Sequence, residues 1–481
     1  MLRPPHLVAR YSTIAPTIRD IFHKSAPINS DITCCGHIKS IRNFKKLTFL
    51  DVSDGSSAQS LNVIMENSGE NKPENAHLVG QSVEVKGQWV ESRGTQANEV
   101  RVVRGNPNHS VTVLGTVPEN YPIQKKNLTL QFLRGLPTLR HRTSTLASIV
   151  RFRSGIELSL AKFFEENRCV KVSPPILTSS DCEGAGKVFI VESANKSNGK
   201  FFEKPAFLTV SAQLHLEVLA LSLNRVWCLS PCFRAEDSHT NRHLCEFWML
   251  EAELSYVTEI AQLTDFVENM IRSVIVEARG SLLNGGLLQD LLQSRYSEED
   301  RQKVTSRWDS LASIEKWPSV TYNETIKIIN EHKNKASEPL LWGDDILTEH
   351  EKWLAGTHFK SPVFVTDYPK AQKPFYMPNL NPAIFDSERP NVACFDLIIP
   401  EIGELVGGSL RECNLDNLVV EMKSRGMNPD TMEWYLSTRE NGSTPHGGFG
   451  LGFERLIAYL SGIDNIKDVS AFPRAPGICP C

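Results

Sequence analysis

The period of the apolar residues changes along the chain, and this change constrains the fold more than any other feature. From about Ile28 to Arg104 the sequence reads as short strands separated by turn signals such as Asp54-Gly55 and Lys86-Gly87. Five short strands without a helical period predict a small closed barrel of the oligonucleotide-binding type. From Ile149 to Phe163, apolar residues recur at three- and four-residue steps, which predicts one buried face of a helix.

The chain of 481 residues is long enough for two folded units. We expect a transit peptide over residues 1–25, the barrel over 26–117, a proline-containing hinge over 118–140 and a larger domain over 141–481. Within the larger domain, a polar stretch near 280–318 is interpreted as a helical accessory insertion. No apolar run approaches the roughly 18 to 20 residues that span a bilayer, so we expect no membrane segment.

Charge and composition limit the partners and the compartment. The net charge of −4 argues against wholesale electrostatic capture of nucleic acid, but it allows a local basic patch. The barrel carries such a run at Lys39, Arg42, Lys45 and Lys46 beside Phe44 and Phe49, where cations could hold phosphates and an exposed ring could stack on a base. A solvated hairpin with a core phenylalanine would give the same pattern.

The eleven cysteines form no repeating framework, which fits a reducing compartment. The first residues carry Arg3, Arg10 and Arg19 with no acid before Asp20, which is typical of a transit peptide, although a frayed terminus would look similar. One cluster, Cys232, His239, His243 and Cys245, has ligand types that suit zinc, but its spacing does not match paired zinc ligands. We therefore expect no zinc.

The stretch from Phe247 to Leu254 alternates strictly. Phe247, Met249, Glu251 and Glu253 share one strand face, and the opposite face is apolar. A carboxylate face on a buried strand needs partners, and an ion-paired edge strand is the structural alternative. Arg234 precedes this strand, and its planar fork suits a phosphate.

Two later segments add groups suited to a nucleotide. Five glycines between Gly442 and Gly452 remove side chains that would obstruct a bound nucleotide, and Arg455 follows them at a predicted helix start. Asp396 and Glu404 are hard oxygen donors of the kind that Mg²⁺ prefers. Asp396 could instead cap a neighbouring turn.

Three segments, SPPIL, CFRAEDSHTNRHLCEFWMLEAEL and GGFGLGFERL, resemble in this order the signature motifs of the class II aminoacyl-tRNA synthetases. The resemblance implies an α+β catalytic domain on an antiparallel β-sheet flanked by helices, with ATP and Mg²⁺ as substrate and cofactor. It assigns catalysis to Arg234, Arg455 and Glu404, and Mg²⁺ binding to Asp396 and Glu404. The ATP-binding residues that it implies are Arg234, Glu236, His243, Phe247, Asp396, Glu404, Gly452 and Arg455.

Further strings, including SDCEGAG, TVSAQLHLE and EIGELVGGSLRE, resemble asparaginyl-tRNA synthetases of the bacterial and organellar type from about Ile32 to Pro476. The resemblance implies asparagine contacts from Glu183, Ser211, Gln213, Glu251 and Arg411. Aspartate enzymes add a lysine three residues after the glutamine, where this chain has Leu216. The missing cation, with Glu251 as an acceptor for an amide NH₂, favours asparagine.

The same resemblance implies tRNA(Asn) as partner, with Arg42, Phe49 and Asn62 at the anticodon. Asn62 stands where the family usually has glutamine. Pro175 belongs to the motif that forms dimers, so we expect a homodimer. With the arginine-rich start, the expected location is the mitochondrial matrix. Two alternatives remain: an aspartyl-tRNA synthetase, discriminating or non-discriminating, and a non-catalytic tRNA-binding paralogue.

Overall fold

The structure is a computed structural model of the chain. It describes residues 14–23, 26–67, 77–94, 96–124, 126–180, 188–193, 201–280, 286–295, 297–312, 315–332, 338–380 and 388–481. The chain forms two compact units, Met1–Arg151 with Gln289–Tyr296 and Phe152–Leu288 with Ser297–Cys481. Each unit is described by itself.

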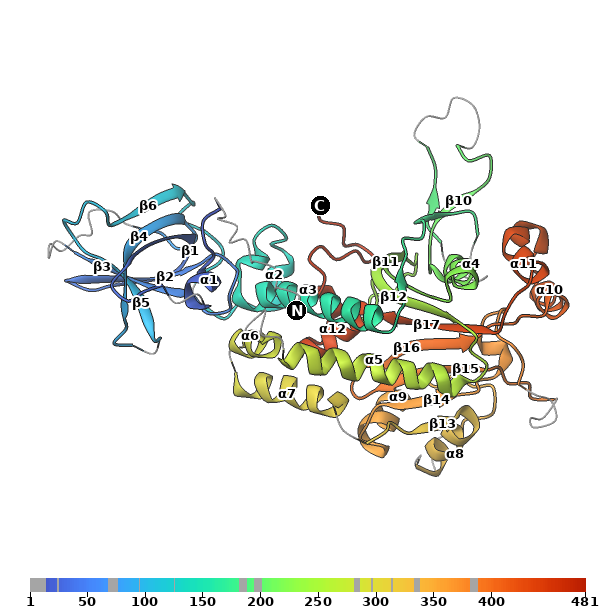
Figure 1. Ribbon diagram of the computed structural model, residues 1–481. Coiled ribbons are helices and arrows are strands. Elements are labelled where there is room, and N and C mark those ends of the chain that lie inside the picture. The colour runs from blue at the N-terminus through green and yellow to red at the C-terminus, as the bar shows by residue number, and fades with distance from the viewer. Residues whose placement is uncertain are drawn as a thin grey trace, which may run out of the picture. The chain divides into compact units, whose positions relative to one another are not determined.

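The first unit contains the predicted barrel (Figure 1). Its strands are β1 (Asp31–Asn43), β2 (Leu47–Ser53), β3 (Leu61–Glu66), β4 (Ser82–Glu91), β5 (Asn98–Val102) and β6 (Ser110–Gly115). They lie in the order β1-β2-β3-β5-β4-β6, and a pairing of β1 with β4 closes five of them into a barrel. The expectation of a five-stranded barrel is confirmed. The sixth strand, β6, pairs with β4 beyond the closed ring and was not recognised as a strand from the sequence.

The folded part of this unit begins earlier than the predicted boundary at residue 26. Helix α1 (Ile18–His23) buries Ile18 and Ile21 in the barrel core. The turn after β2 supplies partners for its first N–H groups, since Ile18 N donates to Asp54 Oδ2 at 2.8 Å and Arg19 N to Ser56 Oγ at 3.1 Å. The helix therefore packs on the barrel core.

The predicted hinge over 118–140 is partly helical. It contains α2 (Leu130–Arg134), whose N-cap Thr129 accepts a hydrogen bond from Phe132 N at 3.2 Å. A 3₁₀ turn follows at Arg140–Arg142, and α3 (Ser144–Glu166) then provides the predicted amphipathic helix. The side chains at Ile149, Phe152, Ile156 and Leu160 are buried, as their spacing predicted.

The second unit is built on an eight-stranded sheet in the order β13-β14-β15-β16-β17-β12-β11-β7. The strands are β7 (Val170–Lys171), β11 (Arg225–Phe233), β12 (Glu246–Ser255), β13 (Ser319–Thr321), β14 (Val363–Thr366), β15 (Cys394–Ile399), β16 (Gly403–Leu410) and β17 (His446–Gly452). The pairings from β14 to β11 are antiparallel, as predicted. The two outermost pairings, β13 with β14 and β11 with β7, are parallel, so the sheet is mixed.

Helices flank this sheet, and a small sheet of three strands adjoins it (Figure 1). The helices are α4 (Gln213–Leu223), α5 (Ile260–Gly280), α7 (Glu298–Ala312), α8 (Tyr322–His332), α9 (Thr348–Trp353), α10 (Leu415–Ser424), α11 (Glu433–Glu440) and α12 (Phe453–Ser461). Helix α6 (Leu287–Gln293) belongs for the most part to the first unit. The small sheet consists of β8 (Leu177–Thr178), β9 (Ile190–Val191) and β10 (Ala206–Leu208). None of the described helices combines the length and apolar character needed to cross a membrane.

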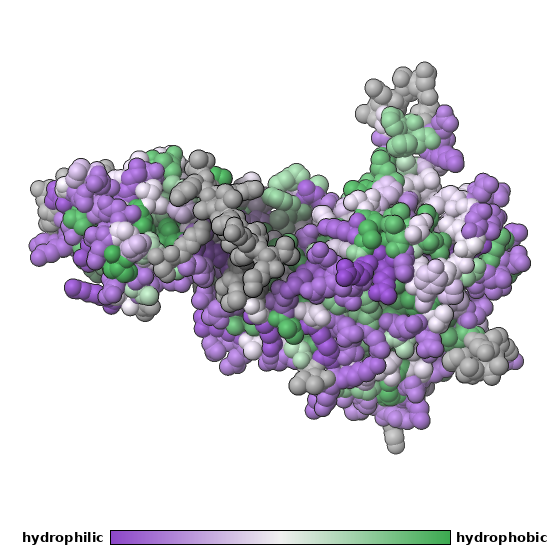
Figure 2. Space-filling view, viewed as in Figure 1, coloured by the Kyte–Doolittle hydropathy of each residue, from purple (hydrophilic) through white to green (hydrophobic). Residues whose placement is uncertain are grey.

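Helix α7 lies in the stretch 280–318 that was interpreted as an accessory insertion, and it packs on the rest of the unit. Its visible surface is mainly hydrophilic (Figure 2), but Val304, Trp308 and Leu311 on its other face are fully buried. Trp308 Nε1 donates to Leu460 O of α12 at 2.8 Å, and Arg307 Nη1 donates to Tyr459 O at 3.1 Å. The helix belongs to the core of this unit because its apolar face packs against α12.

Candidate active site

Strand β12 lies between β11 and β17 and forms one wall of a cavity of about 210 Å³. Glu251 and Glu253, which the alternation predicts on one face of this strand, both line the cavity and are almost completely buried. The charged and polar residues that line the cavity are Ser211, Gln213, Arg234, Glu251, Glu253, Lys373, Tyr376, Asp396, Glu404 and Arg411. Its walls therefore carry both cations and carboxylates, which suits a ligand with both kinds of charge.

Two glycines of β17 allow close contact with side-chain and backbone atoms of the neighbouring strands. A Cβ on Gly448 would collide with Glu253 Oε2, and a Cβ on Gly447 would lie 2.9 Å from Ser409 O. These two glycines serve close packing of the sheet, which corrects the expectation that all five clear the way for a nucleotide. Gly452 differs, since a Cβ there would meet the Arg455 side chain at 3.4 Å.

The predicted asparagine contacts Ser211 and Glu251 meet at the start of α4. Ser211 Oγ donates a short hydrogen bond to Glu251 Oε1, and Ala212 N donates to both carboxylate oxygens at 3.1 and 3.0 Å. These bonds fix the carboxylate. Cys232 Sγ also donates to Glu251 Oε2 at 3.9 Å, and Glu251 still lines the cavity.

Arg411 on the turn after β16 is held rigidly. Its Nε and Nη2 donate to the two oxygens of Glu253 at 3.0 and 2.9 Å, and its Nη1 donates to Ser409 Oγ at 2.7 Å. Its guanidinium carbon lies 5.2 Å from the centre of the Tyr376 ring. A bidentate pair of this kind orients the guanidinium plane toward one position in the cavity.

Arg234 and Phe247 lie side by side, as the resemblance implied. Arg234 follows β11, and its guanidinium carbon lies 5.6 Å from the centre of the Phe247 ring. The backbone N–H of Arg234 donates to Cys245 O at 2.9 Å, which joins the two ends of the intervening loop. The ring and the guanidinium thus offer a flat surface and a phosphate ligand next to each other.

Arg455 enters the site from the first turn of α12. Its Nη1 donates to Glu404 O at 2.9 Å and lies 3.6 Å from Glu404 Oε2. Burial alone would raise the pKa of the Glu404 carboxyl, but Arg455, Lys373 and Arg234 outweigh burial and lower it. Glu404 is therefore an ionised carboxylate among cations.

Asp396 and Glu404 converge on the space above Gly407. A Cβ on Gly407 would lie 3.3 Å from Asp396 Oδ1 and 3.4 Å from Glu404 Oε1. Because glycine has no Cβ, the two oxygens face a common space that suits a cation. The other oxygen of Asp396, Oδ2, accepts from Lys373 Nζ at 2.7 Å. Sequence reasoning did not identify Lys373, which the tertiary fold brings to this acid.

The loop between β11 and β12 carries Glu236 and His243. His243 Nδ1 lies 2.6 Å from Thr240 Oγ1 and 3.0 Å from Ser238 Oγ, and burial together with Arg455 lowers the pKa of its imidazole. The alternative zinc ligands do not assemble. Among the described residues, the group of potential ligands whose atoms lie within 4.8 Å of one another is Glu217, Glu253 and His446.

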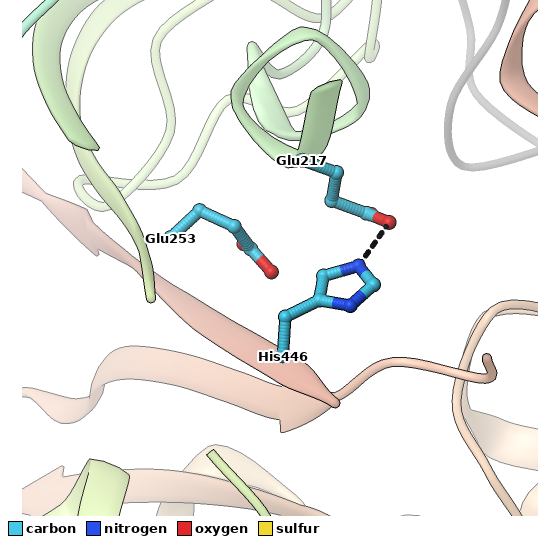
Figure 3. A group of neighbouring side chains, drawn as sticks. All are labelled: Glu217, Glu253 and His446. Carbon is cyan, nitrogen blue, oxygen red and sulfur yellow. Dashed lines mark hydrogen bonds and ion pairs between the residues drawn. The ribbon is translucent and has the colours of Figure 1, made fainter. Parts of the chain in front are cut away.

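That group belongs to a buried network that sequence reasoning missed (Figure 3). Glu217 Oε2 accepts from Arg439 Nη2 at 2.7 Å, from Tyr435 Oη at 2.8 Å and from His446 Nε2 at 3.1 Å. These atoms do not fit a metal site because guanidinium groups already occupy the carboxylates and His446 Nδ1 faces a carbonyl, Thr444 O, at 2.7 Å. The available signal was the acid Glu217 within an otherwise apolar helix.

The structure does not place the remaining predicted residues at the cavity walls, or does not describe them. Glu183 is outside the described residues. Pro175 is exposed between β7 and β8. On the barrel, Phe49 pairs with Arg42 across β1 and β2, and Asn62 pairs with Asp51 across β2 and β3, so the three predicted anticodon residues share the outward face.

Comparisons with known proteins agree with this geometry. A family model described as tRNA synthetases class II (D, K and N) matches residues 134–476. The mitochondrial asparagine–tRNA ligase of Saccharomyces cerevisiae is 44% identical over 480 residues, which cover 96% of each chain. The asparagine–tRNA ligase of Microcystis aeruginosa is 38% identical over 470 residues, 95% of this chain and 98% of that one.

Solved structures give the same result. Asparaginyl-tRNA synthetase from Pyrococcus horikoshii complexed with asparaginyl-adenylate superposes with a TM-score of 0.82 at 28% identity, covering 97% of this chain and 99% of that one. With the barrel and the mixed sheet described above, the chain belongs to the class II aminoacyl-tRNA synthetases of the aspartate, lysine and asparagine group and, within it, to the asparagine–tRNA ligases.

Proposed function

We propose that the cavity beside β12 is where this ligase binds asparagine and ATP and forms asparaginyl-adenylate. The observation that carries the proposal is that Arg411 and Glu251 reach the same cavity as Arg234. One side thus offers a donor and an acceptor for a carboxamide, while the other offers a cation for a phosphate. The Pyrococcus horikoshii relative was solved with asparaginyl-adenylate, which supports the assignment.

The reaction needs positioning and charge neutralisation by the protein. The asparagine carboxylate attacks the α-phosphorus of ATP, pyrophosphate leaves, and the asparaginyl group then passes to the 3′ end of tRNA(Asn). Arg234 stabilises negative charge at the α-phosphate because its fork is fixed beside Phe247, whose ring stacks on adenine. Arg455, with Gly452 beside its side chain and with Glu236 and His243 on the loop, meets the far end of the triphosphate.

Asp396 and Glu404 are the residues that would hold Mg²⁺. Their oxygens Oδ1 and Oε1 face one space, and both are hard donors of the type that Mg²⁺ prefers. The ion, when bound, neutralises charge on the phosphates. Lys373 keeps Asp396 oriented by occupying its other oxygen.

Selection of asparagine over aspartate rests on Glu251. Its carboxylate can accept from the substrate NH₂, whereas a substrate carboxylate would meet it charge to charge. We expect Glu251→Gln to lower the ratio of asparagine to aspartate kcat/KM in ATP–pyrophosphate exchange by about tenfold or more. The exposed acid Glu440 provides the control, since Glu440→Gln should leave the ratio unchanged.

Two results would count against these assignments. Wild-type exchange that is equal or greater with aspartate would reject the proposed specificity. If Glu251→Gln raises aspartate activation by no more than asparagine activation falls, Glu251 is not the discriminating residue.

Three further assignments complete the proposal. The barrel face with Arg42, Phe49 and Asn62 binds the anticodon of tRNA(Asn), supported by the stacking of Arg42 on Phe49 at 5.6 Å. The protein forms a homodimer, supported by exposed apolar residues in the segments that the resemblance assigns to the dimer motif, namely Leu158 on α3 and Val170, Ile176 and Leu177 in the chain around Pro175. It works in the mitochondrial matrix, supported by its mitochondrial relatives and by the arginine-rich start, of which residues 1–13 lie outside the described residues.

A further inference from the structure

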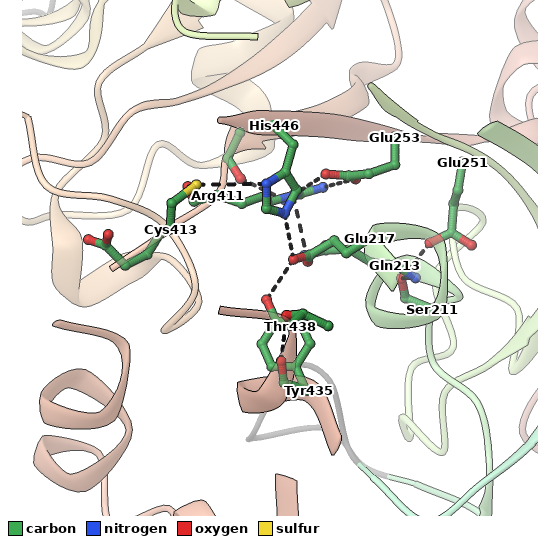
Figure 4. A network of polar contacts seen from close by, with 12 residues as sticks. Ser211, Gln213, Glu217, Glu251, Glu253, Arg411, Cys413, Tyr435, Thr438 and His446 are labelled. Atoms are coloured by element: carbon green, nitrogen blue, oxygen red, sulfur yellow. Dashed lines mark hydrogen bonds and ion pairs between the residues drawn. The ribbon is translucent and has the colours of Figure 1, made fainter. Parts of the chain in front are cut away.

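Glu217 on α4 lies behind the cavity wall and does not line the cavity. Its side chain is fully buried, and its carboxylate collects hydrogen bonds from four residues on α4, α11 and β17 (Figure 4). The donors are Gln213 Nε2 at 3.0 Å, Tyr435 Oη at 2.8 Å, Arg439 Nη2 at 2.7 Å and His446 Nε2 at 3.1 Å. A buried acid with so many partners holds its neighbours in one arrangement.

The first consequence concerns Gln213, which does line the cavity. A carboxylate can only accept, so the amide of Gln213 must direct its NH₂ end toward Glu217. The carbonyl oxygen is then the end that a cavity ligand can meet. This oxygen accepts from an ammonium or a carboxamide NH₂, but it repels a carboxylate.

The second consequence concerns Arg411. Glu253 forms a bidentate pair with the Arg411 guanidinium, and a second carboxylate oxygen, Glu217 Oε1, lies 3.8 Å from Arg411 Nε. Two buried carboxylates therefore face one guanidinium. The positive charge that would attract a substrate carboxylate is largely compensated from behind, while the N–H groups of Arg411 can still donate to a neutral carbonyl.

The third consequence concerns His446, which carries a positive charge next to the carboxylate of Glu217. Its two ring nitrogens face Thr444 O and Glu217 Oε2, and both of these oxygens accept. Each nitrogen must then carry a proton, so the ring is an imidazolium. With Arg411 and Arg439, it makes three buried cations around the buried carboxylates of Glu217 and Glu253. Without the charge of Glu217, these three cations would be left with one carboxylate.

We propose that Glu217 is a positioning residue that makes the pocket select a carboxamide over a carboxylate, acting through the amide direction of Gln213 and the charge of Arg411. This inference rests on the proposed assignment of the cavity as the asparagine site. It extends the selection mechanism from Glu251, which would touch the substrate, to an acid that does not.

Glu217→Gln tests the inference because it keeps the shape and removes the charge. A glutamine at this position no longer forces the NH₂ end of Gln213 to face it, and it leaves an excess of positive charge behind Arg411. In ATP–pyrophosphate exchange, we expect the ratio of asparagine to aspartate kcat/KM to fall by about tenfold or more. The change should come mainly through the KM for the amino acid, while the KM for ATP stays within about twofold of wild type.

Two companion variants keep the test decisive. Glu440→Gln removes an exposed acid next to Arg439 and should leave the ratio unchanged. Glu217→Asp keeps the charge among the buried cations, so it folds even if Glu217→Gln does not, but its shorter side chain draws back from Gln213. We expect Glu217→Asp to lower the ratio by a smaller factor than Glu217→Gln.

The outcomes separate this inference from the proposed function. If wild type shows no asparagine-dependent exchange, the proposed function fails. If wild type prefers asparagine and a folded Glu217→Gln protein keeps the wild-type ratio, the inference alone fails. If Glu217→Gln does not fold, an unchanged ratio in Glu217→Asp overturns the inference in the same way.

Discussion

At the scale of single residues, the neighbours of His446 and Glu217 determine whether each of these buried groups is charged. Burial alone would lower the pKa of the His446 imidazole, but Cys413 and the carboxylates of Glu217 and Glu253 raise it to about 10. Burial alone would raise the pKa of Glu217, but Arg439 and His446 hold it well below its usual value. The two groups therefore stay oppositely charged over the physiological range.

This pairing predicts a pH dependence of stability. The pKa of His446 is about 10 in the folded protein against an ordinary value of 6.5, so the folded state holds the proton more tightly. The stabilisation is fully present below pH 6.5 and is lost as the pH rises to about 10. The difference in Tm between wild type and His446→Gln should therefore shrink over this window. A difference that stays constant across it would contradict the assigned charge.

Gly407 provides a second prediction at this scale. A methyl group there would lie between Asp396 Oδ1 and Glu404 Oε1, in the space assigned to Mg²⁺. We expect Gly407→Ala to raise the Mg²⁺ concentration for half-maximal exchange by roughly tenfold. Gly356→Ala is the control, because a Cβ there meets nothing nearer than Pro400 Cβ at 3.9 Å. An equal Mg²⁺ response in both variants would reject the assigned position.

At the scale of elements, helix α7 shows how a polar sequence hides a core contribution. Trp308 is fully buried, donates to Leu460 O and packs against Phe152 with ring centres 5.8 Å apart. Trp308→Ala should lower the free energy of unfolding by about 3–5 kcal/mol, measured by urea denaturation. The exposed Gln302 on the same helix gives the control, since Gln302→Ala should change it by less than about 0.5 kcal/mol. If Trp308→Ala lowers the free energy of unfolding by as little as Gln302→Ala does, α7 does not belong to the core.

At the scale of the whole molecule, tRNA binding and adenylate formation use different units. We expect Phe49→Ala to raise the KM for tRNA(Asn) by about tenfold in aminoacylation, since an aromatic stack on a base is worth roughly 1–3 kcal/mol. ATP–pyrophosphate exchange without tRNA should stay unchanged. Leu114→Ala, at a position that is 59% exposed on β6, serves as the control. Loss of both activities in Phe49→Ala would point to a folding defect instead.

The oligomeric state is the other prediction at this scale. Leu158 is 65% exposed on α3, and a charge at this position would oppose burial against a second copy. We expect Leu158→Glu to sediment as a monomer where wild type sediments as a dimer. Val420→Glu changes an equally exposed residue, at 67%, on α10 and should remain dimeric. A wild-type protein that sediments as a monomer would reject the homodimer.

The amino-acid order by itself determined the features that depend on local periodicity. The barrel strands, the helix from Ile149 to Phe163 and the two faces of β12 each follow from side-chain repeats within one segment. Arg234 and Phe247 lie in one motif, and the structure places them next to each other.

Only the tertiary structure decided where distant charges meet. Separate segments contribute Glu217, Arg411, Arg439 and His446. Their charges interact strongly only when folding removes water from around them. The tertiary structure also decided that Lys373 binds Asp396. It likewise decided that the few apolar residues of α1 pack in the barrel core and that those of α7 pack against α12. Periodicity reports which side of a segment is buried, but not which segment covers it, because packing partners are chosen across the whole chain.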